Sequence, residues 1–212
     1  MTRRDRSITI AAMVFRWQRV SDDPAIAART PPGQVLTEKF PVLHFGRVPD
    51  YPDLARWELR VFGDVATPFT LNWTELRQLP TVEVTLDIHC VTRWSKLDTT
   101  WAGAPLSHIA EVAEPRNARF VIFHSEYGYS TNIPIEVALD PGCLLAWHYD
   151  GRPLEPDHGY PLRAVVPRRY FWKSAKWLRG VEFSADDKPG FWERNGYSNS
   201  ADPWREERYS DF

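Results

Sequence analysis

The chain has 212 residues, with 26 Lys and Arg against 28 Asp and Glu, so its formal net charge at pH 7 is −2. This balance argues against a nucleic-acid or polybasic membrane surface, and no apolar run is long enough to cross a bilayer. Two cysteines without a Cys/His cluster exclude a disulfide scaffold and an ordinary structural zinc site.

Residues 1–36 are predicted to form an irregular N-terminal arm. A basic start and the apolar run Ile8–Phe15 resemble part of an export signal, but Arg16 and Arg19 interrupt the path to a cleavage site. The alternatives are a poorly ordered tail and a true start at Met13. We expect a cytoplasmic protein, with twin-arginine export to the periplasm as the less favoured alternative.

Short strands and short helices alternate irregularly from residue 57 onward. Apolar-polar alternation predicts strands over 57–61 and 82–88, and apolar runs predict strands over 120–123, 144–147, 162–166 and 181–183. Short helices are expected from Asn72 or Thr74 to Leu79, over 107–112 and around 132–137, with a hairpin turn at 150–151.

This order of elements favours an α+β fold with a mixed β-sheet over a doubly wound fold. No repeat, low-complexity block or linker interrupts the regular region, so we expect one domain over residues 37–185. Residues 186–212 are predicted to form an aromatic C-terminal tail packed on that domain.

Cys90 is the first candidate functional residue. It comes directly after the clearest predicted strand, where a side chain can project into a site from a rigid support. Its neighbours His89, Arg93 and Lys96 would stabilise a thiolate, which is the form that attacks substrates or binds metals. An inert buried cysteine is the alternative, and it is the interpretation adopted for Cys143.

A nucleophilic cysteine also requires an adjacent histidine and a group that orients it. The chain has six histidines, but none stands at a spacing that selects it as the partner. No paired-histidine zinc motif is present either, so zinc chemistry is not indicated. A cysteine hydrolase therefore stays an alternative that the local sequence does not single out.

A second candidate site is the cationic and aromatic stretch 163–177. It combines Arg163 and Lys176 with the hydroxyl of Ser174 and several aromatic rings. Such a loop can bind an anion, phosphate in particular, and support a flat heterocycle by stacking. Neither a dinucleotide fingerprint nor a P-loop is present, so the anion is not held by those motifs.

Two further segments are weak signals when taken alone. Residues 40–49 form a loop with two prolines and a glycine around His44 and Arg47, and residues 128–134 offer the hydroxyl of Tyr129. A loop and a turn tyrosine are the plain structural interpretations of these segments.

In this order along the chain, the segments resemble the molybdopterin-binding domain of the sulfite oxidase family over residues 37–185. The matching pieces are Phe40–Pro49, His89–Ser95 with Trp101–Gly103, Gly128–Pro134, and Gly159–Pro167 leading to Lys173–Trp177. The tail from Gly190 to Trp204 is similar to that of a short branch of sulfite-oxidase-like oxidoreductases.

The resemblance implies a set of cofactor contacts. Cys90 matches the single protein ligand to molybdenum, a soft thiolate that suits this metal. The other implied cofactor contacts are His44, Arg47, Val48, Ser125, His158, Arg163, Ser174, Ala175 and Lys176. Tyr129 and Arg93 are implied to shape the substrate pocket beside Cys90.

The implied function is a molybdenum-cofactor-dependent oxidoreductase that transfers an oxygen atom to or from a small substrate. Electrons would pass to or from a separate redox protein. The alternatives are the cysteine hydrolase and a cofactor-free binding module that holds a partner protein through an aromatic groove, with Trp192, Tyr197 and Trp204 in its tail.

Overall fold

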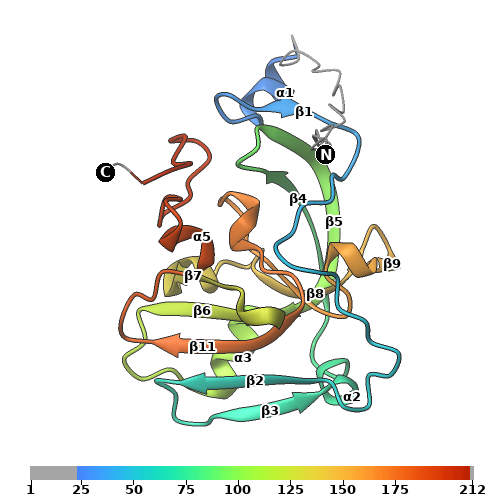
Figure 1. Ribbon diagram of the computed structural model, residues 1–212, viewed down its shortest axis with the longest axis vertical. Coiled ribbons are helices and arrows are strands. Elements are labelled where there is room, and N and C mark those ends of the chain that lie inside the picture. The colour runs from blue at the N-terminus through green and yellow to red at the C-terminus, as the bar shows by residue number, and fades with distance from the viewer. Residues whose placement is uncertain (1–22, 211–212) are drawn as a thin grey trace, which may run out of the picture.

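The computed structural model describes residues 23–210, which build two β-sheets with short helices around them (Figure 1). The first sheet has six strands in the order β1-β5-β8-β10, with β4 also paired to β5 and β9 to β8. Its strands are β1 (Val35–Leu36), β4 (Val82–His89), β5 (Trp94–Pro105), β8 (Leu144–Tyr149), β9 (Arg152–Pro153) and β10 (Arg163–Val165).

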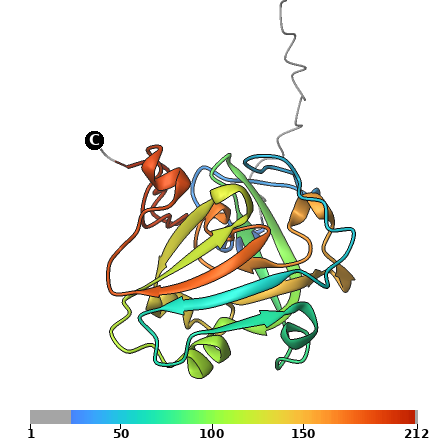
Figure 2. The same ribbon diagram turned by 60° about the horizontal axis from the view of Figure 1, so that its bottom comes forward.

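The second sheet has five strands in the order β3-β2-β11-β6-β7. They are β2 (Glu58–Gly63), β3 (Phe69–Asn72), β6 (Phe120–Ser125), β7 (Ser130–Pro134) and β11 (Leu178–Ser184). In Figure 2 the orange strand β11 lies between the teal strand β2 and the yellow-green strand β6. One pair in each sheet is parallel, β1 with β5 and β2 with β11, while the other pairs are antiparallel. The predicted α+β class with mixed sheets is confirmed.

The helices are short. The α-helices are α1 (Pro24–Ala28), α2 (Trp73–Leu76), α3 (Leu106–Ala113), α4 (Ile135–Ala138) and α5 (Phe191–Arg194), and the 3-10 turns are η1 (Glu126–Gly128), η2 (Pro156–His158) and η3 (Phe171–Lys173). Helix α2 begins at a capping box, in which Asn72 and Glu75 each accept a hydrogen bond from the other's backbone N–H. No helix among the described residues is long and apolar enough to cross a membrane.

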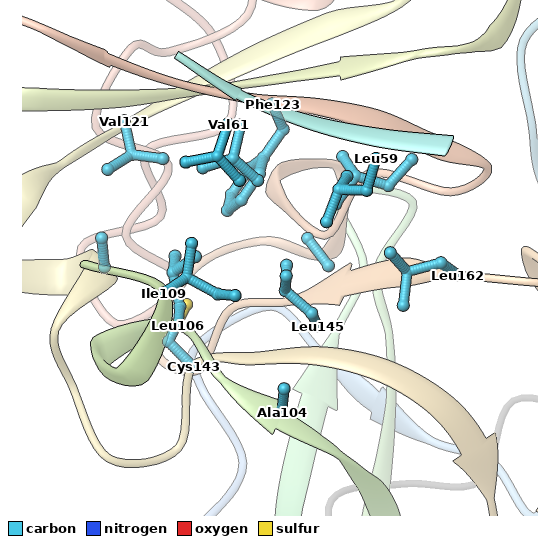
Figure 3. Packing of buried hydrophobic residues seen from close by; sticks show 14 of the residues in the cluster. Leu59, Val61, Ala104, Leu106, Ile109, Val121, Phe123, Cys143, Leu145 and Leu162 are labelled. Carbon is cyan, nitrogen blue, oxygen red and sulfur yellow. The ribbon is translucent and has the colours of Figure 1, made fainter. Parts of the chain in front are cut away.

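The main core lies between the second sheet and the layer formed by α3 with strands β5, β8 and β10. Alternate residues of the sheet, such as Leu59, Val61 and Phe123, point toward Leu106 and Leu145 on the other side (Figure 3). All five side chains are almost fully buried. This burial fixes the register of the strands, because a slip of one residue would turn the apolar side chains to the solvent.

The prediction of an irregular N-terminal arm is wrong for part of its length. Helix α1 begins at Pro24, and the side chain of Asp23 accepts a hydrogen bond from the backbone N–H of Ala25. Strand β1 pairs with the start of β5 and so belongs to the first sheet. Residues 1–22 and 211–212, which include Met13 and most of the segment that resembles part of an export signal, lie outside the described residues.

The helix expected around residues 132–137 is wrong at its start. Residues 130–134 continue the second sheet as β7, and α4 begins only at Ile135. Asn132 is held in the strand because its side chain bonds to Asp187 and Asn199 of the C-terminal segment. Tertiary contacts therefore set the boundary that local capping signals had placed earlier.

Candidate active site

One cavity of about 330 Å³ opens between the two sheets and is lined by segments that are far apart in the sequence. Four segments contribute most of its walls: residues 38–53, here called the strap; residues 90–94, the cysteine turn; the stretch 171–177; and residues 185–210, the C-terminal cover. The lining residues are Phe40, Pro41, Leu43, His44, Phe45, Cys90, Val91, Thr92, Trp94, Tyr129, Arg163, Phe171, Trp172, Ser174, Ala175, Lys176, Trp177, Trp192 and Tyr197.

The cysteine turn begins where β4 ends and leads directly into β5. The backbone N–H of Cys90 donates to the carbonyl of Trp94 at 2.8 Å, and that of Arg93 donates to the carbonyl of Cys90 at 3.0 Å. These bonds close a tight turn that requires φ +77° at Arg93. The turn therefore holds Cys90 at one fixed point of the cavity wall.

Cys90 is 8% exposed, and the groups around its sulfur shift its pKa in opposite directions. Burial raises the pKa of the thiol, while a hydrogen bond from Thr92 Oγ1 at 3.1 Å and the charges of Arg208 and Lys176 oppose this rise. Within residues 23–210, no histidine hydrogen-bonds to the sulfur. The arrangement lacks the Cys–His pair that a cysteine hydrolase needs and offers instead a protected soft ligand.

Arg163 is a fully buried cation at the inner end of the same cavity. Its guanidinium donates to the carbonyls of His158 at 2.8 Å and of Ser174 at 2.9 Å, and it lies over the ring of Phe171 at 4.4 Å. Burial lowers its pKa to about 9, so it is still charged at neutral pH. No carboxylate among the described residues pairs with it.

Lys176 is the second cation of the cavity. Its Nζ donates to the carbonyl of Asp157 at 2.6 Å and forms no ion pair within the described part of the chain. Burial and the nearby charge of Arg163 lower its pKa to about 7. A buried and a half-buried positive charge without a carboxylate are costly alone, and an anionic ligand would relieve that cost.

Ser174 and Ala175 form the turn between these two cations. The hydroxyl of Ser174 accepts a hydrogen bond from the backbone N–H of Val166, and the carbonyl of Ala175 accepts one from that of Ala164. Because both bonds run to β10 and the residue after it, the turn is fixed against the first sheet. The side chain of Ser174 thus holds the turn in place.

Aromatic rings form most of the remaining wall. Phe40 stacks on the ring of His158 with centroids 3.9 Å apart and also contacts Trp101, and His44 meets Trp177 edge-on at 5.2 Å. The Nδ1 atom of His158 is buried and has no hydrogen-bond partner within residues 23–210. His158 therefore does not line the cavity itself, but it supports Phe40, which does, and one of its ring nitrogens is available.

Several predicted site residues do not line the cavity. Arg47 and Val48 lie on the strap, where Arg47 donates from Nε to the hydroxyl of Tyr127 at 3.1 Å. Arg93 is exposed, and its guanidinium lies beside Gly33 of the N-terminal arm. Ser125 is buried behind the wall at the end of β6, and its hydroxyl finds no partner in the described chain.

The cavity is lined by two tyrosines with different environments. The hydroxyl of Tyr129 donates to the carbonyl of Trp172 at 2.6 Å, and burial raises its pKa well above the usual value. Tyr197, on the C-terminal cover, lines the same cavity as Cys90, and its hydroxyl has no hydrogen-bond partner among residues 23–210. Tyr197 is therefore the tyrosine of the cavity wall with a hydroxyl available.

From the sequence, Tyr197 and Trp192 are expected at a functional surface only in the binding-module alternative. The structure places both rings in the wall of the cavity, stacked on each other with centroids 4.9 Å apart. A signal for this role was present in the sequence, since the tail is rich in aromatic residues, but its position beside Cys90 depends on the fold.

Comparisons with known proteins agree on one family. The family model "Oxidoreductase molybdopterin binding domain" matches residues 45–192. The chain is 47% identical over 199 residues to "Uncharacterized oxidoreductase YuiH" of Bacillus subtilis (strain 168), which covers 93% of this chain and 99% of that protein.

The fold is also similar to that of a solved structure, the sulfane dehydrogenase SoxCD from Paracoccus pantotrophus. The TM-score is 0.59 with 20% sequence identity, and the match covers 68% of this chain. It covers 41% of the SoxCD chain, so the present chain corresponds to less than half of that protein's length.

Proposed function

This chain belongs to the family of oxidoreductase molybdopterin-binding domains and is a molybdopterin-dependent oxidoreductase, and on that premise we propose that it transfers an oxygen atom to or from a small substrate. Such a reaction moves two electrons in each turnover. The proposal therefore includes a separate redox protein that supplies or removes those electrons one at a time.

One observation carries the proposal: a soft thiol and two cations that form no ion pair, the buried Arg163 and the half-buried Lys176, line the same cavity. Cys90 would suit the metal of a molybdopterin cofactor, and Arg163 and Lys176 would suit its phosphate. The unpartnered nitrogen of His158 and the aromatic walls would suit its flat ring system.

When bound, the cofactor supplies a metal that changes its oxidation state by two electrons, which is the redox chemistry that this reaction requires. Cys90 would hold the metal as a thiolate, and binding would release the thiol proton. Arg163 and Lys176 would hold the phosphate, and the turn at Ser174 and Ala175 keeps both cations in place.

The chain's own residues also shape the substrate region. Tyr197 offers a free hydroxyl near Cys90, and it can orient a polar atom of a substrate by a hydrogen bond. Thr92 donates to the Cys90 sulfur, and such a bond withdraws charge from the sulfur and so tunes the metal. The aromatic rings of Phe45 and Trp192 limit the access of water.

Tyr129 and Arg93 have less direct roles in the proposed function than the family resemblance implied. Tyr129 keeps the carbonyl of Trp172 in position and so supports the wall. The side chain of Arg93 lies toward the N-terminal arm, so a direct contact with the substrate would require it to rotate. Tyr197 is the residue that we assign to the substrate.

The test compares Cys90→Ser with Cys143→Ala, because Cys143 is the second cysteine and is fully buried in the core. Each full chain is purified from a host that makes the cofactor, and molybdenum and pterin are measured. We expect about one molybdenum per chain in the unchanged protein and in Cys143→Ala, as a single thiolate ligand requires.

Cys90→Ser is expected to abolish turnover even if the pterin is still bound. Full activity and metal content in Cys90→Ser would remove the ligand assignment. Activity without any metal, stopped by alkylation of Cys90, would support the cysteine hydrolase instead.

A further inference from the structure

Residues near the two ends of the chain hold the cysteine turn. Gln34 Nε2 of the N-terminal arm donates to the carbonyl of Cys90 at 3.0 Å, and Arg208 Nη1 of the C-terminal cover donates to the carbonyl of Val91 at 2.8 Å. Both side chains are buried, at 2% and 5% exposure. Both lie outside residues 45–192, the region that the family model matches.

The buried guanidinium of Arg208 donates its hydrogen bonds to backbone carbonyls. Besides Val91, its guanidinium donates to the carbonyl of Pro32 at 3.4 Å and lies over the ring of Tyr170 at 4.9 Å. The carboxylate of Glu206 is 3.6 Å away and half-exposed. A buried guanidinium is costly to desolvate. The position of Arg208 against the cysteine turn therefore depends on all of these contacts together.

The arm and the cover also meet tightly at Gly33. This glycine has φ +67°, and a Cβ atom there would lie 3.0 Å from Arg93 Nη1 and 3.3 Å from Arg208 Nη2, with Glu206 closer still. The φ of +67° favours glycine at this position, and the nearby atoms are the ends of flexible side chains. The cysteine turn, the arm and the cover therefore come close together at Gly33.

We propose that Arg208, together with Gln34, is a positioning residue that fixes the cysteine turn so that the Cys90 sulfur points into the cavity. The inference rests on the proposed function for the identity of the ligand that the sulfur meets. It goes beyond that function because it assigns the control of the sulfur's position to the two ends of the chain. Arg208 acts through the carbonyl of Val91 and does not touch the substrate region.

The test uses Arg208→Met, which keeps an unbranched but shorter side chain and removes the donors and the charge. Arg208→Lys keeps the charge and a donor group at one point, and it is expected to recover part of the effect. Arg205→Met is the matched control, because Arg205 belongs to the same segment, is 74% exposed in its side chain and, among the described residues, forms an ion pair only with Glu207. Gln34→Met tests the second contact independently if Arg208→Met folds poorly.

The first measurement is hydrogen–deuterium exchange of the cofactor-free full chain. In Arg208→Met, the amides of Cys90 and Arg93, which close the turn, are expected to exchange about tenfold faster, while those of β6 and β11 stay unchanged. Unaltered exchange in the turn, in both Arg208→Met and Gln34→Met, would overturn the inference.

The second measurement uses protein loaded with molybdenum and pterin. The electron paramagnetic resonance signal and the midpoint potential of the metal are expected to change in Arg208→Met and to stay the same in Arg205→Met. An unchanged signal and potential in Arg208→Met would also overturn the inference. Absence of molybdenum from the unchanged protein would instead contradict the proposed function, and hydrogen exchange would still decide whether Arg208 fixes the turn.

Discussion

The strap and the C-terminal cover both close the cavity, but different forces hold them. Between residues 40 and 52 the strap makes no backbone–backbone hydrogen bond to the rest of the described chain. It is held by ring contacts such as Phe40 on His158 and by two side-chain hydrogen bonds, from Arg47 to Tyr127 and from Tyr51 to Glu126. The C-terminal cover is fixed by buried charges and hydrogen bonds. Lys173 and Glu193 form an ion pair at 2.5 Å with almost no exposure.

This difference indicates which wall of the cavity can open. Arg163 is fully buried, so a phosphate cannot reach it without movement of the chain. Ring contacts are individually weak and form again easily, whereas breaking a buried ion pair leaves an unpaired charge. We therefore expect the strap to open for the cofactor while the C-terminal cover stays in place.

The largest effect is expected when the cover loses its ion pair. Lys173→Met leaves Glu193 buried without its cation and should lower the free energy of unfolding by about 3–5 kcal/mol. The double variant Lys173→Met/Glu193→Gln keeps the acceptor for Thr131 and Trp172 and should recover much of the loss. Urea denaturation followed by tryptophan fluorescence measures both. Equal losses in the single and double variants would show that the charge is not what holds the cover.

Removal of the main ring contact of the strap should have a smaller effect on stability and a larger one on opening. Phe40 is half-buried against several rings, so Phe40→Ala should cost about 2–3 kcal/mol, less than a fully buried ring. Limited proteolysis should then cut within residues 38–53 and leave the cover intact. Cleavage in the cover first would reverse the comparison.

The cations at the inner end of the cavity give a third test, which depends on pH. The pKa of Lys176 lies at about 7, below the usual value for lysine, so its charge is lost as the pH rises through 7. Sulfate, which does not titrate in this range, should therefore bind the cofactor-free protein about tenfold more weakly at pH 8 than at pH 6. Isothermal titration calorimetry measures this change. Lys176→Met should bind weakly at both pH values, whereas the surface control Lys39→Met should keep the full dependence.

The smallest effect is expected at the outer edge of the strap. Phe45 is 39% exposed and contacts the tilted ring of Phe191 with centroids 4.1 Å apart. Phe45→Ala should lower the free energy of unfolding by no more than about 1 kcal/mol. Amide exchange in the strap should become faster without any change in the cover. A loss of stability as large as that of Phe40→Ala would mean that the strap is held along its whole length.

The sequence predicted some of the strands that carry the cavity residues more clearly than others. Strand β4 was clear because Val84, Leu86 and Ile88 alternate with polar residues, and it led directly to Cys90. Strand β5 was missed. Its buried positions include Ser95 and Thr99, which are polar but bonded to His89 and to the carbonyl of Leu86, so periodicity in apolar residues could not reveal it.

Individual site residues also differ in whether the local sequence could identify them. The stretch around Arg163 and Lys176 was recognisable because cations and rings stand close together in the sequence. Tyr197, Gln34 and Arg208 could not be identified as site residues from the local sequence alone. The hydrogen bond from Gln34 to Cys90 spans 56 positions, and the one from Arg208 to Val91 spans 117 positions. Contacts of that separation are set by the fold and leave no local pattern.

The parallel pairing of β2 with β11 joins residues 60–63 to residues 180–183 in the middle of the second sheet. During synthesis, more than half of the chain is made between β2 and its neighbour β11. High contact order of this kind slows folding. Until β11 has left the ribosome, one edge of β2 lacks its hydrogen-bonding neighbour, and nascent chains of this protein are therefore expected to need chaperones during that interval.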